Sequence, residues 1–412
     1  MKDSDIPSVR RRDILKVTGG VGIAATAGCL NTGGGGGKKG TYEIGMVDSR
    51  SGSLSAFGQR NKRGQELALK AVNDVGVKDG KLKISVEDSQ STQQGGVSAA
   101  QKLVNQNGVP LMVGAVGSGV SIAIHESVIS NSSVVQISQN STSPNLRDYP
   151  DLLRMCPNGD TQAEALADMI TEDGYDSVAI TWINNDYGQG IMESFKNAYD
   201  GDIAYNQSHD QGKSSYSNVI TSMAQADAGA WLFVTYQPEF TTMAQEAYDQ
   251  GATDKADWYG GDSVKGPKVL KGAPKGSLEG MKVVTPSAAL DQDNYKSFAS
   301  DFKSKYGSEP TAWSAYTYDA IVTGALATQA AKTFSGNSLM KVVRDVTRPG
   351  GKKATSYKAA HDILADGGSA KDVNYEGVSG PIDLDEKGDP KAYLQIFTVK
   401  DHSYSSTGFT AA

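Results

Sequence analysis

The sequence predicts an α/β fold with two lobes, each a doubly wound parallel sheet covered by helices on both faces. The chain has 412 residues, which is too long for one hydrophobic core and favours two or more lobes. Strand-like runs alternate with segments of helical periodicity, and strands separated by such helices form parallel sheets. The alternation begins again near Asp160, which indicates a second lobe of the same kind.

The first series of elements opens with the strand-like run Tyr42–Val47. A Gly/Ser turn follows, and apolar residues then recur at helical spacing over 60–73. The remaining elements of this series alternate in the same way, as strand 83–87, helix 94–104, strand 111–113, helix 125–129 and strand 134–137.

The second series continues this alternation. Its elements are helix 162–171, strand 178–183, helix 190–199, strand 203–205, helix 216–226, strand 230–234, helix 240–250 and strand 258–259. Open sheets of this kind bind ligands at the carboxyl ends of their strands, where the topology switches. The predicted binding loops are therefore 49–57, 117–119, 138–144, 184–188, 236–239 and 260–263.

The N-terminal segment predicts export and anchoring rather than fold. Arg11 and Arg12, followed by Asp-Ile-Leu-Lys, closely resemble a twin-arginine motif, and the apolar stretch behind them is shorter than the ~20 residues that span a bilayer. The run Thr-Ala-Gly before Cys29 resembles a lipobox, in which Cys29 is lipidated; an incidental, uncleaved cysteine is the alternative. Residues 1–29 are thus interpreted as a twin-arginine lipoprotein signal, and the Gly-rich residues 30–41 as a flexible tether.

Composition excludes several classes of function. With 40 Lys+Arg against 47 Asp+Glu, the net charge is −7, which argues against nucleic-acid binding because phosphates require basic patches. Charged residues make up 21% of the chain, too many for a protein with several membrane spans. Four His and two Cys leave little for a metal site or a disulfide framework, so no metal or cofactor is predicted.

Catalytic signatures are incomplete. Ser118 is not in a nucleophile elbow, because Val116 and Val120 stand where glycines are required. The glycine-rich run 33–39 lacks the spacing of a phosphate-binding loop. Residues 383–388 imitate a calcium loop but carry Lys at a ligand position, so a turn is predicted there. These absences favour binding over catalysis.

Polar residues in the predicted loops could hold a dipolar ligand. Neutral donors at strand ends, beside helix N-termini, can bind a carboxylate without Arg or Lys; they are Ser118, Asn140, Ser141 and Thr142. Asp262 could supply the countercharge for an ammonium group, and Tyr187 and Tyr236 could close over the ligand. Each such residue taken alone is more often a turn former, a helix cap or a packing residue.

Short motifs along the chain have a distinctive order and spacing. They are Gly52–Gly58, Leu67–Asn73, Gly114–Ser118, Ser138–Pro144, Asp186–Gly190, Tyr236–Glu239, Ala315–Ala320 and Gly380–Asp389. From about residue 42 to residue 400, this order resembles the type I periplasmic binding proteins, in the leucine/isoleucine/valine-binding branch that serves ABC importers.

The resemblance implies a substrate-binding protein rather than an enzyme, with two lobes that are joined by three crossovers and close over the ligand. The N-terminal lobe would comprise 42–159 plus 287–374, and the C-terminal lobe 160–286 plus 375–412. The implied partners are an amino acid or similar small solute, ABC permease subunits, and the membrane through the lipid anchor. The implied location is the outer face of the cytoplasmic membrane.

Matched residue by residue, the family pattern gives nine residues a binding role. Ser118 matches the serine that binds the ligand carboxylate, and Asp262 matches an acidic residue that pairs with the α-ammonium. Asn140, Ser141 and Thr142 match a second loop that binds the ligand carboxylate and ammonium. Tyr187 and Tyr236 match tyrosines of the second lobe, and Ser53 and Phe57 lie on the loop that lines the side-chain pocket.

Two departures from the family pattern bear on the ligand. Polar Asn140 and Ser141 stand where branched-chain members usually carry small apolar residues, and Asp262 is one methylene shorter than the usual Glu. A more polar ligand of different size is therefore an alternative to leucine. Two other functions stay open: a receptor of the same fold that signals to a membrane sensor, and an exported hydrolase.

Overall fold

The structure is a computed structural model that describes residues 40–411. The predicted signal, with Arg11, Arg12 and Cys29, lies outside the described residues, as does most of the predicted tether. These assignments therefore stay predictions.

The first sheet has five parallel strands in the order β2-β1-β3-β4-β5. The strands are β1 (Thr41–Asp48), β2 (Lys81–Asp88), β3 (Leu111–Val113), β4 (Val135–Ser138) and β5 (Leu152–Arg154). The helices between them are α1 (Ser55–Val75), α2 (Gln93–Asn105), α3 (Ser118–Ile124), η1 (His125–Ile129) and η2 (Pro144–Asp148). Ile44, Met46 and Val113 are fully buried, as expected for strands covered on both faces.

The second sheet has seven strands in the order β15-β14-β10-β9-β8-β6-β7. Its parallel strands are β6 (Ser177–Ile183), β7 (Asp202–His209), β8 (Ala230–Val234), β9 (Asp257–Gly260) and β10 (Lys282–Pro286). The helices of this part are α4 (Gly159–Glu172), α5 (Asp186–Ala198), α6 (Ser217–Gln225), α7 (Gln237–Asp249), η3 (Asp262–Val264) and α8 (Pro267–Gly272). The predicted pair of parallel-sheet lobes is confirmed.

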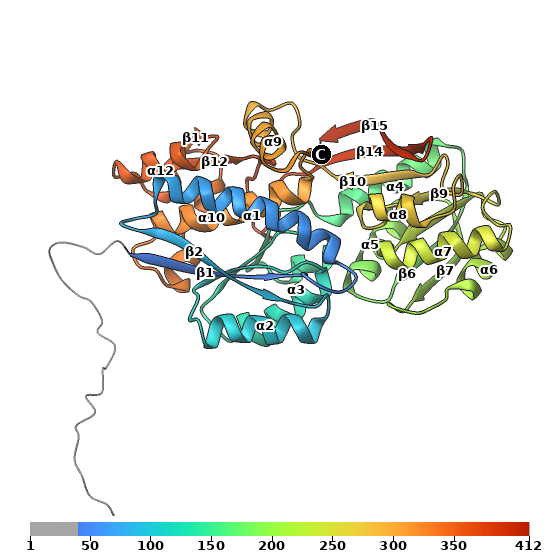
Figure 1. Ribbon diagram of the computed structural model, residues 1–412, viewed down its shortest axis with the longest axis horizontal. Helices are drawn as coiled ribbons and strands as arrows, with labels where there is room; N and C mark the ends of the chain where they lie inside the picture. Colours follow the sequence, from blue (N-terminus) through green and yellow to red (C-terminus); the bar gives the residue numbers. More distant parts are fainter. Residues whose placement is uncertain (1–39, 412) are drawn as a thin grey trace, which may run out of the picture. The chain divides into compact units, whose positions relative to one another are not determined.

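An antiparallel hairpin extends the second sheet and was not predicted. Strand β14 (Tyr393–Lys400) pairs antiparallel with β10, and β15 (Ser403–Ala411) forms the edge (Figure 1). The connecting residues Asp401 and His402 both have positive φ, as a two-residue hairpin turn of type I′ requires. Asp-His is a weak signal for such a turn, which is why the sequence did not reveal it.

The remaining elements follow β10. They are α9 (Asp293–Tyr306), α10 (Ala312–Ala330), α11 (Gly336–Met340), η4 (Asp345–Thr347), α12 (Tyr357–Ala365), η5 (Ala370–Asp372) and a small sheet of β11 (Lys352–Ala354), β12 (Val373–Gly377) and β13 (Gly380–Pro381). Buried Asp319 on α10 accepts hydrogen bonds from the main-chain N–H groups of Val378 and Ser379. The β12–β13 turn is therefore tied to α10, and the predicted lobe boundary at 374/375 falls inside β12.

The chain passes three times between the part built on the first sheet and the part built on the second. The first passage follows β5 into α4, the second follows β10 into α9, and the third links β13 to β14. This matches the three crossovers that the family resemblance implied. All predicted binding loops of both parts lie at the carboxyl ends of strands in the two sheets.

Helices α1 and α10 approach closely because α1 carries glycine at the contact (Figure 1). A Cβ atom on Gly64 would lie 2.1 Å from the main-chain oxygen of Ser314. The Ser314 hydroxyl donates a hydrogen bond to the main-chain oxygen of Arg60, at 3.0 Å, and the rings of Phe57 and Trp313 meet edge to face with centroids 5.4 Å apart. This contact fixes the start of α1 relative to α10.

We expect Gly64→Ala to destabilise the protein by about 1–3 kcal/mol. Alanine in a helix interior normally stabilises relative to glycine by about 1 kcal/mol, so the close contact with Ser314 reverses the usual sign. Urea denaturation of the variant against Gln65→Ala on the same helix measures this. A gain in stability for Gly64→Ala would show that the two helices can separate without cost.

Candidate ligand-binding site

Seven of the nine predicted ligand-binding residues line one cavity between the two parts of the fold. They are Phe57, Ser118, Asn140, Thr142, Tyr187, Tyr236 and Asp262, and they are joined by Leu54, Val116, Gly117 and Ser263. The cavity has a volume of about 20 Å³, enough for one water molecule. Any larger ligand therefore requires the two parts to move apart or these side chains to rearrange.

The first-sheet side of the cavity consists of the loops after β3 and β4, together with Leu54 and Phe57 at the start of α1. Ser118 begins α3, directly after Gly117, whose φ of 89° is in the region that favours glycine. The Ser118 hydroxyl accepts a hydrogen bond from the Ser143 N–H, at 3.1 Å, which joins the two loops. Ser118 and Thr142 are almost fully buried, so they present hydroxyl groups in a place with little competing water.

A buried amide network positions Asn140. The Asn61 side-chain NH₂ donates to Asn140 Oδ1, at 2.8 Å, and to Asp48 Oδ1, at 2.9 Å. The Asn140 NH₂ group has no hydrogen-bond partner within residues 40–411, and an unpaired buried donor costs about 1–3 kcal/mol. Burial raises the pKa of Asp48 to about 6. The network thus fixes the Asn140 side chain and leaves its donor for a ligand acceptor.

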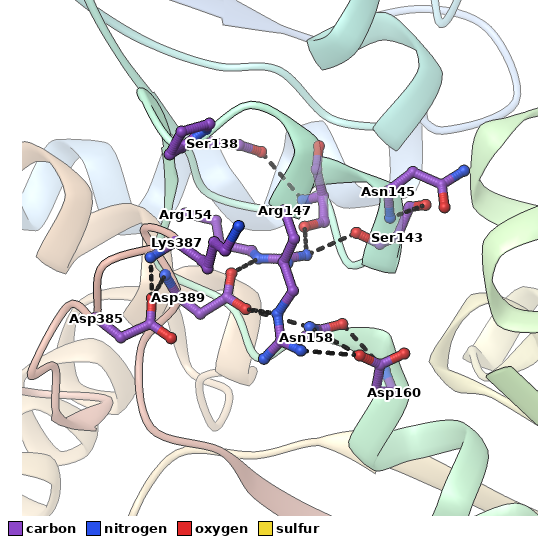
Figure 2. Close-up of polar contacts among 12 residues, drawn as sticks. Ser138, Ser143, Asn145, Arg147, Arg154, Asn158, Asp160, Asp385, Lys387 and Asp389 are labelled. Atoms are coloured by element: carbon purple, nitrogen blue, oxygen red, sulfur yellow. Dashed lines mark hydrogen bonds and ion pairs between the residues drawn. The ribbon is translucent and has the colours of Figure 1, made fainter. Parts of the chain in front are cut away.

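A charged cluster supports the loop after β4 from below (Figure 2). Buried Arg154, at the end of β5, pairs with Asp389 at 2.5 Å and donates to the main-chain oxygens of Ser141 and Ser143 at 3.2 and 2.8 Å. Arg147 contacts the second oxygen of Asp389 at 2.7 Å. Because Asp389 belongs to the third connection between the two parts, this cluster joins the binding loop to that connection.

The second-sheet side of the cavity presents two stacked tyrosines. Asn185 caps α5 by accepting from the N–H groups of Tyr187 and Gly188, and its NH₂ group donates to the Tyr236 hydroxyl at 3.1 Å. The rings of Tyr187 and Tyr236 stack with centroids 5.7 Å apart. The Tyr187 hydroxyl is 2.7 Å from the Ser263 hydroxyl, so one capping residue and one serine orient both rings.

Asp262 supplies the negative charge of this side. Its Oδ1 atom accepts a hydrogen bond from Gln162 on α4, at 2.9 Å, and Gln162 also donates to the main-chain oxygen of Val284. Burial raises the pKa of Asp262 to about 6, although the Gln162 hydrogen bond and the nearby Arg60 charge act in the opposite direction. The carboxylate is therefore ionised at neutral pH, but its charge is costly and favours a cationic partner.

Two predicted residues do not line the cavity. The Ser141 hydroxyl lies 2.7 Å from that of Ser121 on α3, because successive side chains of the loop point to opposite sides. The Ser53 hydroxyl instead accepts a hydrogen bond from Gln211 of the other part of the fold. Ser53 therefore bridges the two parts.

Sequence reasoning missed several residues that shape the site. Gln162 carries no signal, since a polar residue in a helix is usually solvent-exposed. Asn61 could have been found, because it lies on the same face of α1 as the apolar Leu67 and Ala68 and is fully buried. Within residues 40–411, no group of three or more His, Cys, Asp or Glu side chains could hold a metal ion.

Comparison with known proteins identifies the family. The family described as periplasmic binding protein matches residues 41–402. The chain belongs to this family. Together with the relatives described next, this match confirms the predicted resemblance to the leucine/isoleucine/valine-binding branch of type I periplasmic binding proteins. The chain is a binding protein rather than an enzyme.

Relatives of this periplasmic binding protein bear names from the same branch. A Leu/Ile/Val-binding protein homolog of Brucella melitensis is 29% identical over 244 residues, which cover 58% of this chain and 64% of that relative, slightly less than two thirds. The leucine binding protein LivK of Thermotoga maritima has a TM-score of 0.77 at 22% identity, covering 89% of this chain and 98% of that one. The branched-chain amino acid transporter substrate binding protein LivJ of Streptococcus pneumoniae, solved with isoleucine, has a TM-score of 0.76 at 21% identity, covering 90% and 100%.

Family membership implies an exported protein. Among residues 40–411, no helix has both the length and the apolar character needed to span a bilayer.

Proposed function

We propose that this protein is an extracytoplasmic substrate-binding component of an ABC importer, which captures an amino acid between its two lobes and delivers it to a membrane permease. The observation that carries this proposal is the shared cavity, with neutral donors on one side and the Asp262 carboxylate on the other. The names of relatives in the leucine/isoleucine/valine-binding branch support an amino acid as ligand.

The two sides of the cavity suit the two charges of a zwitterion. The hydroxyls of Ser118 and Thr142 and the free NH₂ group of Asn140 can donate to the ligand carboxylate without a fixed positive charge. Asp262 can accept from the ligand ammonium, and pairing offsets the cost of its buried charge. Tyr187 and Tyr236 cover the ligand with stacked rings.

Because the proposed contacts of the ligand lie on opposite sides of the cavity, ligand binding should drive closure of the two parts. The carboxylate donors belong to the part built on the first sheet and Asp262 to the part built on the second, so a ligand makes both sets of contacts only when the two parts are together. A ligand shifts a conformational equilibrium by its difference in affinity for the two states, and contacts that exist only in the closed state provide that difference. The Ser53–Gln211 hydrogen bond adds a direct contact between the two parts.

The same proposal includes an anchor on the outer face of the cytoplasmic membrane through lipidated Cys29, after export directed by Arg11 and Arg12. A single acyl chain binds membranes only marginally, so the proposal predicts more than one chain on Cys29. The Gly-rich residues 30–41 would let the binding lobes reach the permease.

Titration calorimetry of the purified protein with leucine, isoleucine, glutamine and glutamate tests amino-acid binding. We expect saturable binding of at least one of them with one site per chain. The affinity should be highest near pH 7 and should fall towards tenfold per pH unit below about 6, because protonation of Asp262 removes the partner of the ammonium.

Absence of binding to every amino acid would contradict the proposal. Binding that stays constant from pH 5 to pH 7 would show that the ligand ammonium does not pair with Asp262.

A further inference from the structure

A second cavity, of about 240 Å³, adjoins the candidate site. Asp262 lines both cavities. The larger cavity receives Arg60 from α1 and Trp313 from α10, both on the first-sheet side, and Lys265, Phe397 and other residues from the second-sheet side. A ligand that pairs with Asp262 can therefore extend into the larger cavity, while its other end requires the smaller cavity to widen as described above.

Two cations face this larger cavity without direct ion pairs. Within residues 40–411, neither Arg60 nor Lys265 forms an ion pair; both lie against aromatic rings instead. The Lys265 Nζ atom is 3.6 Å from the ring centroid of Phe397, and the Arg60 guanidinium carbon is 5.2 Å from that of Phe57. Of the other buried or partly buried cations, Arg154, Lys282 and Arg348 each have a carboxylate partner. Lys78 and Arg344 donate to main-chain oxygens instead. The larger cavity thus carries two positive charges, of which the charge of Asp262 offsets only one.

The electrostatics of this cavity favour an anion. Burial, and then the charge of Arg60, lower the pKa of Lys265 to about 8, while Asp262 acts in the opposite direction. Asp262 is the acidic residue among the described residues that line the cavity, so two positive charges face one negative charge. When Asp262 pairs with a ligand ammonium, its charge no longer offsets those of Arg60 and Lys265. A second anionic group on the ligand would then supply the missing negative charge.

We propose that the ligand is an acidic amino acid, whose side-chain carboxylate binds between Arg60 and Lys265 in the larger cavity. This proposal rests on the proposed function, because it assigns the α-ammonium to Asp262 and the α-carboxylate to the smaller cavity. The aromatic wall formed by Trp313 and Phe397 packs against the methylene groups between the two ends. The polar residues Asn140 and Ser141 and the shorter acidic side chain of Asp262, which depart from the family pattern, agree with a ligand other than leucine.

Calorimetry with four probes tests the assignment: L-glutamate, its neutral isostere L-glutamine, L-leucine, and glutarate, which lacks the ammonium. We expect glutamate to bind about tenfold or more tightly than glutamine, since charge-assisted hydrogen bonds exceed neutral ones. Arg60→Met and Lys265→Met should each weaken glutamate binding about thirtyfold or more and leave glutamine binding within about threefold. The matched controls Lys62→Met on α1 and Lys268→Met on α8, both exposed, should change neither.

Each outcome decides between the two proposals. If leucine or glutamine binds as tightly as glutamate, or if the two variants weaken glutamate and glutamine equally, the acidic subsite is wrong while amino-acid binding stands. If only glutarate binds, and the variants abolish that binding, the anionic subsite stands and the amino-acid function fails. If none of the four probes binds, both proposals are overturned. Circular dichroism of each variant separates loss of binding from loss of fold.

Discussion

Replacement of Asp262 by asparagine is expected to weaken amino-acid binding by about 2–5 kcal/mol, the range for truncating one partner of a desolvated charge pair. The new side chain keeps the shape and can still accept from Gln162, whose bond to Asp262 measures 2.9 Å. What it loses is the negative charge that a ligand ammonium requires. Titration calorimetry at pH 7 measures the change.

Stability distinguishes this effect from damage to the fold. Because burial raises the pKa of Asp262 to about 6, the ionised form destabilises the folded state at pH 7, and this cost is absent below about pH 4. Asp262→Asn removes that cost, so its melting temperature should equal or exceed that of the parent protein. Asp254→Asn, at an exposed position of the same part, serves as the matched control. Unchanged affinity in Asp262→Asn would contradict the assigned role.

Replacement of Asp389 by asparagine is expected to destabilise the protein by about 3–5 kcal/mol, because it leaves Arg154 buried without its counter-charge. Arg154 has no exposed surface and lies 2.5 Å from Asp389 (Figure 2). Arg147, the other cation on Asp389, is half-exposed and can turn to solvent. Urea denaturation measures the loss.

The control for this prediction is Glu386→Gln, which removes an exposed ion pair with Arg348 and should cost no more than about 1 kcal/mol. The double variant Arg154→Met, Asp389→Leu should recover part of the stability, since a buried pair is often replaceable by apolar residues. A loss below 1 kcal/mol in Asp389→Asn would show that water reaches Arg154.

Much of the fold followed from local patterns in the sequence. Parallel strands that are covered on both faces need apolar runs, so β1, β6 and β8 were visible directly. The position of the site followed as well, because the loops after parallel strands meet at one edge of each sheet. The hairpin β14–β15 was not visible, since its pairing with β10 depends on contacts more than 100 residues apart.

Side-chain direction within the loops could not be derived from the sequence. Asn140, Ser141 and Thr142 are all small and polar, and only the backbone path of the loop decides that Ser141 faces Ser121 while its neighbours line the cavity. Arg60 and Lys265 look like ordinary surface cations in the sequence. Their position depends on the close α1–α10 contact and on the third connection, which are both long-range features.

The pairing of Arg154 with Asp389 also constrains the order of folding during synthesis. The two residues are separated by 235 positions, and Asp389 follows all strands of the described residues except β14 and β15. The binding loop after β4 therefore acquires its support only after most of both sheets has been synthesised. Domains that are completed early in translation can fold one after another, but this chain must complete both lobes together, and a product truncated before Asp389 would retain an unneutralised arginine in its interior.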